Sequence, residues 1–167
     1  WATCNIGARN PEDEGYDFDW GQVSPTDGGW IFNSPTSDKS LNWLRNNGYT
    51  DANGNLTMEH DAAHTYWGAT WRIPTAKDIA ELVENTTSTW TTRNGINGRL
   101  ITSKTNENSI FFPAFNITQG YESGCCVSST PEGTENIFFL YYSIDDFEKS
   151  QCTRGWGDGI PIRPVTE

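Results

Sequence analysis

The alternation of hydrophobic and polar positions divides the chain into a helical first half and a strand-rich second half. Ile79, Leu82 and Val83 stand at the i, i+3 and i+4 positions of an amphipathic helix. Just before them, Thr75 and Asp78 have the spacing of a capping box, with Asp in place of the usual Glu. The pattern therefore predicts a helix that begins after Thr75.

Two shorter helices are predicted earlier in the chain. Segment 37–48 places Leu41 and Leu44 on one helix face and ends in a glycine, a common C-terminal stop. Thr57 can cap a second helix that runs through the sequence HDAAHTYW and ends at Gly68.

Beyond residue 90 the pattern becomes that of short strands joined by turns. Asn-Gly pairs at 94–95 and 97–98 each predict a turn. Segment 136–144, NIFFLYYSI, is apolar or aromatic almost throughout and predicts a central strand covered on both faces. Segment 161–165, PIRPV, predicts a last short strand at an edge. Helices that precede strands indicate an α+β domain.

Composition and charge narrow the possible partners. The 167 residues fit a single domain, 1–167, and include 8 Trp, 8 Phe and 6 Tyr, a density that argues against disorder. A net charge of −11 without any basic cluster makes nucleic acid and anionic lipid poor partners. No apolar run approaches the roughly 20 residues that span a membrane. The chain opens on Trp1, and we interpret it as a mature or excised domain of an exported protein.

Four cysteines allow three pairings. A bridge between the adjacent Cys125 and Cys126 would be strained, so we expect one of them to pair with Cys152 and Cys4 to be a buried thiol. The alternative is that all three later cysteines are reduced and lie close together. No CxxC spacing of the kind found in zinc sites occurs.

Two short motifs have a weak likeness to metal sites. The sequence HDAAH spaces His60 and His64 like the zinc-binding pair of HExxH, with Asp61 at the position of the general base. No third histidine exists, so an ordinary amphipathic helix is the favoured interpretation. The sequence DANGN (51–55) resembles the start of a calcium loop but lacks the downstream Gly and Glu. We expect no metal and no cofactor.

The segment WGATWRIPT (67–75) is the most distinctive in composition. Trp67 and Trp71 could form a platform for a sugar. We favour a structural role, with both tryptophans in the core and Arg72 satisfied by carbonyl groups or by a buried acid such as Glu81.

Several motifs, in order and spacing, resemble a bacterial paralogous-domain family first noted in Fibrobacter succinogenes and abundant in Bacteroidetes. The motifs are WATCNIGA (1–8), GYDFDWG (15–21), EHDAAH (59–64), WGATWRIPT (67–75), the long segment 81–114, VSST (127–130) and IRPV (162–165). Segment 22–55 shows little likeness and is interpreted as a variable, insertion-like region.

The resemblance implies a C-type lectin-like fold of the formylglycine-generating-enzyme branch, with short helices packed on a small, mostly antiparallel twisted sheet. Similar domains are variable receptor-binding proteins of diversity-generating retroelements, in which the surface between a WSS-like and an RPV-like strand varies. Here that surface corresponds to 131–161. Cys126 and Val127 replace the usual Tyr-Trp. The EPN and WND calcium motifs are absent, which argues against calcium-dependent sugar binding.

We therefore predict a non-catalytic recognition module on an exported bacterial surface protein or adhesin, with a protein or glycan ligand. Phe147 and Trp156 would be aromatic anchors, and Cys152 would fix the segment to the body of the domain. The alternative is a thiol-dependent enzyme that uses Cys125, Cys126 and Cys152. The predicted binding residues are Phe138, Tyr142, Asp145, Asp146, Phe147, Glu148, Gln151, Thr153, Trp156 and Asp158.

Overall fold

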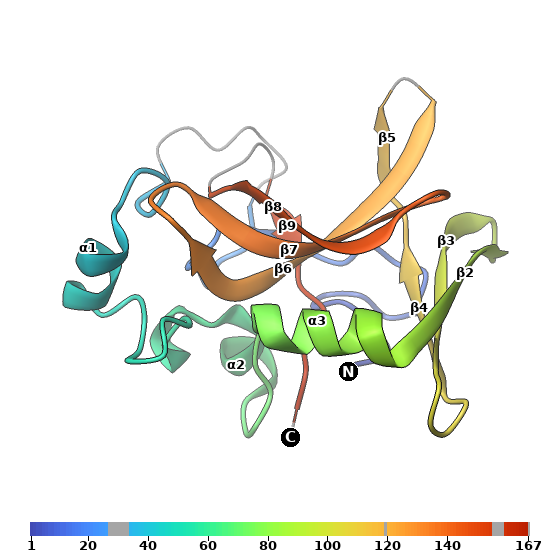
Figure 1. Cartoon of the computed structure of the whole chain (residues 1–167), viewed down its shortest axis with the longest axis horizontal. Helices are drawn as coiled ribbons and strands as arrows, with labels where there is room; N and C mark the ends of the chain where they lie inside the picture. Colours follow the sequence, from blue (N-terminus) through green and yellow to red (C-terminus); the bar gives the residue numbers. More distant parts are fainter. Residues whose placement is uncertain (27–33, 119, 155–158, 167) are drawn as a thin grey trace.

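The computed structural model describes residues 1–26, 34–118, 120–154 and 159–166. In these parts of the chain, a few short helices accompany three small antiparallel sheets, which confirms the α+β class (Figure 1). None of the helices described is both long and apolar enough to cross a membrane. Trp156 and Asp158, two of the predicted binding residues, lie outside the described residues.

The first two helical regions are shorter than predicted. Helix α1 (Leu41–Asn46) is capped by Ser40, and its Leu44 is fully buried, so the expected insertion-like region contributes to the core. The predicted second helix is instead a 3-10 turn, η1 (Met58–His60), followed by α2 (Ala62–Trp67).

Asp61, rather than Thr57, caps the α2 helix. The Thr57 hydroxyl donates to the Gly48 carbonyl, whereas the Asp61 carboxylate accepts from the backbone N–H of His64. Thr57 makes no side-chain capping bond to η1, and the extended backbone of Asp61 separates η1 from α2. The predicted end at Gly68 is confirmed, with a φ of 65° there.

The third helix, α3 (Ala76–Asn85), confirms the prediction made from the capping box. The Thr75 hydroxyl accepts from the Asp78 N–H, and the Asp78 carboxylate accepts from the Thr75 N–H. Ile79 and Leu82 are buried and Val83 is partly buried, so the apolar stripe faces the sheets.

The first of the two larger sheets has the order β2 (Thr86–Arg93), β3 (Ile96–Ser103), β4 (Ser109–Pro113). The turn predicted at 94–95 is confirmed, and both of its residues have positive φ. The turn predicted at 97–98 is wrong, because these residues lie inside β3. A Cβ on Gly98 would lie 2.2 Å from the Phe112 carbonyl oxygen, so this glycine permits β4 to approach closely.

The second large sheet has the order β5 (Asn116–Thr118), β6 (Tyr121–Glu132), β7 (Asn136–Ser143), β8 (Phe147–Thr153). Strand β7 is central and has both faces packed, as predicted. Ile137 and Phe139 belong to a core cluster with residues of α1 and α2, whereas Leu140 and Tyr142 pack with residues of α3. The pairing of β6 with β7 shifts register between Val127 and Pro131, where the VSST motif bulges.

The two ends of the chain lie together. Strand β1 (Asp17–Phe18) pairs with β9 (Ile160–Pro161), and the Ala2 N–H donates to the Pro164 carbonyl. The strand predicted over 161–165 is shorter than expected, since β9 has only two residues. Farther along the same segment, Val165 forms an isolated bridge with Arg72.

Candidate functional site

The β7–β8 hairpin presents side chains of the predicted binding set on one face. In the antiparallel register, Gln151 lies opposite Phe138, and Phe147 lies opposite Tyr142. Directly opposed side chains in such a pair share a face of the sheet. We call this surface the hairpin face and define it by the partly buried or exposed residues Phe138, Phe147, Lys149, Gln151 and Thr153.

Two of the predicted binding residues are not accessible on this face. Tyr142 is only 1% exposed, and its hydroxyl donates to the Pro113 carbonyl, so the prediction that it binds ligand is wrong. Its ring is covered because β7 is central and α3 and β4 pack over this part of it. Glu148 is exposed but lies opposite Tyr141, on the other face of the hairpin.

The aspartates predicted as specificity determinants lie in the β7–β8 turn. The buried Ser143 organises the turn: its hydroxyl donates to the Asp146 carboxylate and accepts from the N–H groups of Asp145 and Asp146. Asp145 also accepts a long hydrogen bond of 3.4 Å from the Tyr121 hydroxyl. Both aspartates are exposed, so they remain accessible next to the hairpin face.

A buried arginine from the neighbouring sheet holds this turn in place. The Arg99 guanidinium donates to the carbonyls of Ser143 and Ile144, each at 2.8 Å, and to the Ser88 hydroxyl. Burial lowers the pKa of Arg99, and its attraction to Asp146 and Asp145 acts in the opposite direction. The hairpin turn is therefore fixed to β3 rather than free to move.

Lys149 was missed by the sequence prediction. Its ammonium nitrogen lies 4.7 Å from the centre of the Phe138 ring, which places a cation over an aromatic side chain on the hairpin face. Period-2 alternation from Phe147 through Lys149 to Gln151 is the signal that identifies it, because these three side chains share one face of β8.

The cysteines form no disulfide. Cys126 lies opposite Leu140 on one side of β7, and Cys152 lies opposite Ile137 on the other side. Because β7 lies between them, the strands that carry Cys126 and Cys152 are two strand spacings apart, about 9–10 Å. A disulfide requires Cα atoms within about 7 Å of each other. The expected bridge to Cys152 is therefore wrong, and the expected buried Cys4 is only partly buried.

The buried thiols have the properties of structural cysteines. Burial raises the pKa of Cys126 to about 11 and that of Cys152 to about 12, so both are protonated at neutral pH. The Sγ atom of Cys126 accepts a hydrogen bond from the Arg163 N–H. A protonated thiol is a poor nucleophile.

The histidine pair predicted as a weak metal motif is separated by a break in the helix. His60 ends η1, stacks on the Tyr49 ring at 3.9 Å between ring centres, and lies 3.1 Å through Nδ1 from the Gly21 carbonyl. His64 lies in α2. In the described part of the chain, no three or more His, Cys, Asp or Glu side chains are grouped to hold a metal.

The two tryptophans of the WGATWRIPT segment are not core residues, contrary to our expectation. Trp67 is 36% exposed and Trp71 is partly buried, with their rings in edge contact at 4.9 Å. The buried face of α2 consists of the small Ala62 and Ala63, and its last turn extends beyond the core.

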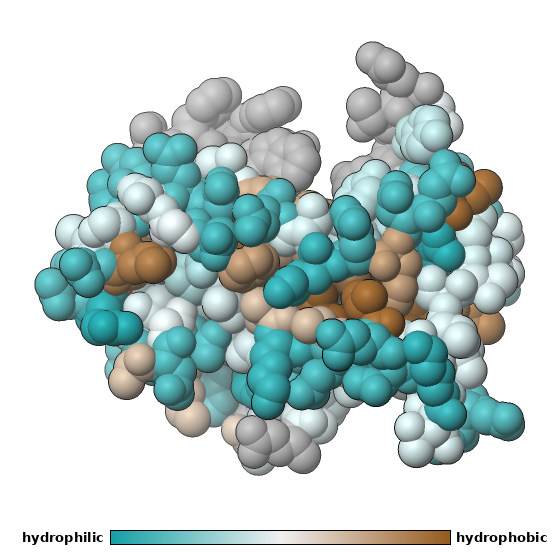
Figure 2. All heavy atoms as spheres, in the orientation of Figure 1, coloured by the Kyte–Doolittle hydropathy of each residue, from teal (hydrophilic) through white to brown (hydrophobic). Residues whose placement is uncertain are grey.

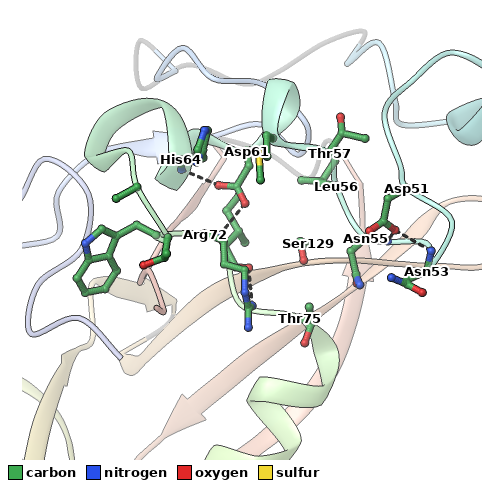
Figure 3. A pocket seen from close by; sticks show the side chains of 15 residues that line it. Asp51, Asn53, Asn55, Leu56, Thr57, Asp61, His64, Arg72, Thr75 and Ser129 are labelled. Atoms are coloured by element: carbon green, nitrogen blue, oxygen red, sulfur yellow. Dashed lines mark hydrogen bonds between the residues drawn. The ribbon is translucent and has the colours of Figure 1, made fainter. Parts of the chain in front are cut away.

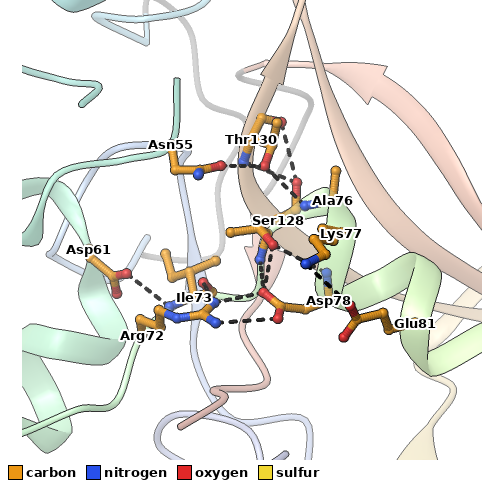
Figure 4. A network of polar contacts seen from close by, with 11 residues as sticks. Asn55, Asp61, Arg72, Ile73, Ala76, Lys77, Asp78, Glu81, Ser128 and Thr130 are labelled. Atoms are coloured by element: carbon orange, nitrogen blue, oxygen red, sulfur yellow. Dashed lines mark hydrogen bonds and ion pairs between the residues drawn. The ribbon is translucent and has the colours of Figure 1, made fainter. Parts of the chain in front are cut away.

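Arg72 pairs with an acid, as predicted, but the acid is Asp78 rather than Glu81 (Figure 4). Its guanidinium donates to both carboxylate oxygens, at 2.7 and 3.3 Å. Burial raises the pKa of Asp78, but hydrogen bonds from Arg72 and Thr75 outweigh this effect and lower it below its usual value. The capping box of α3 and the WRIPT segment thus share one carboxylate.

This network leads to a pH-dependent prediction. Asp78→Asn is expected to lower the free energy of unfolding by about 1–2 kcal/mol at neutral pH, because the ion pair with Arg72 is lost and a neutral amide oxygen accepts the bonds from Thr75 more weakly than a carboxylate does. Since the pKa is lowered in the folded state, the contribution of Asp78 is present above its ordinary pKa of 3.8 and is lost as the pH falls through the folded value. Urea unfolding at neutral and acidic pH measures the difference.

Glu81→Gln on the same helix is the matched control for Asp78→Asn. Glu81 is exposed and forms a surface ion pair with Lys77 at 3.6 Å, so little change is expected. A loss for Asp78→Asn that stays constant down to low pH would contradict the role assigned to the ionised carboxylate.

A second feature is an open pocket of about 680 Å³ between the 51–57 loop and the 69–75 segment (Figure 3). We call it the loop pocket. It brings together residues of four motifs that the sequence analysis treated separately: DANGN, HDAAH, WGATWRIPT and VSST. In Figure 3, Ser129 of β6 lies between the wall that carries Asp61 and Arg72 and the wall that carries Asn55.

Comparisons of the chain with protein-family models, with curated proteins and with solved structures give no match.

Proposed function

We propose that this chain is a non-catalytic recognition module of an exported bacterial surface protein, with a C-type lectin-like fold, and that it binds a protein or glycan through the hairpin face. The observation that carries the proposal is the placement of Phe138 beside the exposed side chains of Lys149, Gln151 and Thr153 on one face. Phe147, which packs against the α3 core cluster, adds a second partly buried ring at the end of this face. Aromatic anchors surrounded by polar groups are typical of binding hot spots.

The rest of the molecule supports this proposal by holding the hairpin rigid. Strand β7 is packed on both faces, and Arg99 and Ser143 fix the turn. A preorganised surface loses little conformational entropy on binding. Figure 2 shows α3 covered by hydrophilic side chains, with hydrophobic surface beside it toward the four-stranded sheet.

Charge favours a cationic ligand. The chain carries a net charge of −11, and Asp145 and Asp146 are exposed in the turn next to the hairpin face. A basic patch on the partner would be attracted over a distance of about a Debye length and would associate faster at low salt.

Burial and position make the cysteines less suited to the alternative, a thiol-dependent enzyme. Cys126 and Cys152 lie on opposite sides of β7, and burial raises the pKa of both. Reactive cysteines instead have lowered pKa values and accessible sulfur atoms. The proposal also includes diversification of the amino-acid sequence of segment 131–161 by a retroelement.

The experiment is the binding of fluorescently labelled domain to intact bacterial and epithelial cells, followed by flow cytometry. Phe138→Ala is expected to weaken binding at least about tenfold, since truncation of an aromatic hot spot costs about 2 kcal/mol or more. Gln151→Arg is expected to weaken it as well, because it places a long cationic side chain in the centre of the hairpin face.

The matched control is Asn42→Arg, which places the same charge on an exposed polar position of α1, a helix that packs against the opposite face of the hairpin. Unchanged binding by Gln151→Arg, combined with loss of binding by Asn42→Arg, would contradict the proposed surface. Thermal unfolding of each variant identifies any loss caused by misfolding.

A further inference from the structure

We infer that the loop pocket is a second binding site, and that its ligand is a neutral, hydroxyl-rich molecule of the sugar class. Its volume of about 680 Å³ lies within the range of small-molecule sites, about 300–1,000 Å³. It shares no lining residue with the hairpin face, so the inference goes beyond the proposed function.

The first argument concerns the charged groups of the pocket, which are already paired within the chain. Both carboxylate oxygens of Asp61 accept backbone N–H groups, from His64 at 3.0 Å and from Ile73 at 2.9 Å. The Arg72 guanidinium is engaged by both oxygens of Asp78. A charged ligand would have to compete with these contacts, whereas a neutral one would not.

Asp51, a further charged residue that lines the pocket, also accepts hydrogen bonds from the backbone of its own loop. Asp51 Oδ1 accepts the N–H groups of Asn53 at 2.8 Å and of Asn55 at 3.0 Å. These bonds hold the 51–55 turn closed and orient the two asparagine side chains on one wall.

The second argument concerns neutral groups that face the pocket with hydrogen-bonding capacity to spare. Ser129 is 3% exposed, and its hydroxyl makes no hydrogen bond to any residue that the structure describes. Asn55 Oδ1 accepts from the Thr130 hydroxyl at 2.6 Å, which leaves the Asn55 amide N–H groups as donors. Asn53 adds an exposed amide. Amide and hydroxyl groups match the alternating donors and acceptors of sugar hydroxyls.

The third argument is an aromatic wall. Trp71 lines the pocket, and the Trp67 ring packs edge-on against it with 4.9 Å between the ring centres. An indole ring offers a flat apolar surface against which the C–H face of a sugar ring can pack, while polar groups of the same pocket bind its hydroxyls.

The test uses ¹H–¹⁵N NMR titration of the whole chain with methyl glycosides of glucose, galactose, mannose and N-acetylglucosamine at millimolar concentrations. At least one is expected to give saturable shifts that include the indole N–H of Trp71. Asn53→Ala and Ser129→Ala are each expected to weaken that binding about 2- to 10-fold, the range for loss of one hydrogen bond. Trp71→Ala is expected to weaken it more.

The controls separate this inference from the proposed function. Asn42→Ala on α1 should bind the glycosides like the wild type. Asn53 is exposed in a surface turn, so Asn53→Ala is expected to fold. The test therefore holds even if Trp71→Ala fails to fold. The absence of saturable shifts would overturn the inference. So would glycoside binding by both Asn53→Ala and Ser129→Ala that is as tight as that of the wild type. Preferential binding of methylammonium or acetate would also overturn it. Glycoside shifts confined to the hairpin face would do so as well, while they would support the proposed function.

Discussion

Arg154→Met is expected to lower the free energy of unfolding by about 3–4 kcal/mol. Arg154 is fully buried, and its guanidinium donates to four backbone carbonyls. The acceptors are the carbonyls of Thr36, Lys39, Thr134 and Asn136. Methionine keeps the apolar stem but removes all four hydrogen bonds, and the Thr36 carbonyl keeps only a long bond of 3.3 Å from the Lys39 N–H. Each buried group left unsatisfied costs about 1–3 kcal/mol.

The position of Arg154 explains the expected size of this effect. It immediately follows β8 and joins the end of that strand to the 34–39 segment and to the β6–β7 turn. Its guanidinium also lies 5.5 Å from the centre of the Trp20 ring. Arg45→Met, at an exposed position of α1, is the matched control and should change stability little. Equal stability of the two variants in urea unfolding would contradict the anchoring role.

Arg163→Met is expected to destabilise the fold by a similar amount, about 3–4 kcal/mol. Arg163 is 0% exposed and donates to Asn5 Oδ1 at 2.7 Å and to the carbonyls of Ala2 and Phe111. Its guanidinium stacks 4.5 Å from the centre of the Phe112 ring. One side chain thus ties the two ends of the chain to β4.

Arg163→Lys distinguishes the shape of the guanidinium from its charge. Lysine keeps the charge but cannot reach three acceptors in the same planar arrangement, so most of the loss should remain. Recovery of wild-type stability by Arg163→Lys would show that charge alone accounts for the effect. Thermal and urea unfolding of both variants make the comparison.

The elements set by local sequence could be predicted, as α3 shows. Its capping box and apolar stripe lie within ten residues, and both are formed as expected. The two Asn-Gly pairs show the limit of this reasoning. The pair at 94–95 forms a turn, whereas Gly98 lies in β3, because only the approach of β4 determines which glycine is needed for space.

The candidate site was predicted only in part, for reasons of tertiary packing. Period-2 alternation correctly places Phe138 and Tyr142 on one face of β7, but it cannot say where along that face α3 and β4 cover the strand. Phe138 is therefore left partly exposed and Tyr142 is buried. Cys152 was expected to fix this segment, whereas hydrogen bonds from Arg154 do so. A buried arginine cannot be distinguished from a surface arginine by sequence pattern.

The loop pocket was missed because its residues are distant in sequence. Asp51, Asp61, Arg72 and Ser129 come from four motifs, each too weak to indicate a site alone. They meet because the β6 bulge bonds to both walls: the Ser129 N–H donates to Pro74 and its carbonyl accepts from Leu56. Only the fold brings these contacts together.

The central claim is that the hairpin face contacts the ligand, and site-specific photo-crosslinking tests it most directly. A benzoylphenylalanine residue is placed at position 151 on β8 or, as control, at position 42 on α1, and the labelled domain is irradiated on cells that bind it. The account predicts a covalent adduct to a cell-surface component from position 151 and none from position 42. An adduct from position 42 with none from position 151 would contradict it.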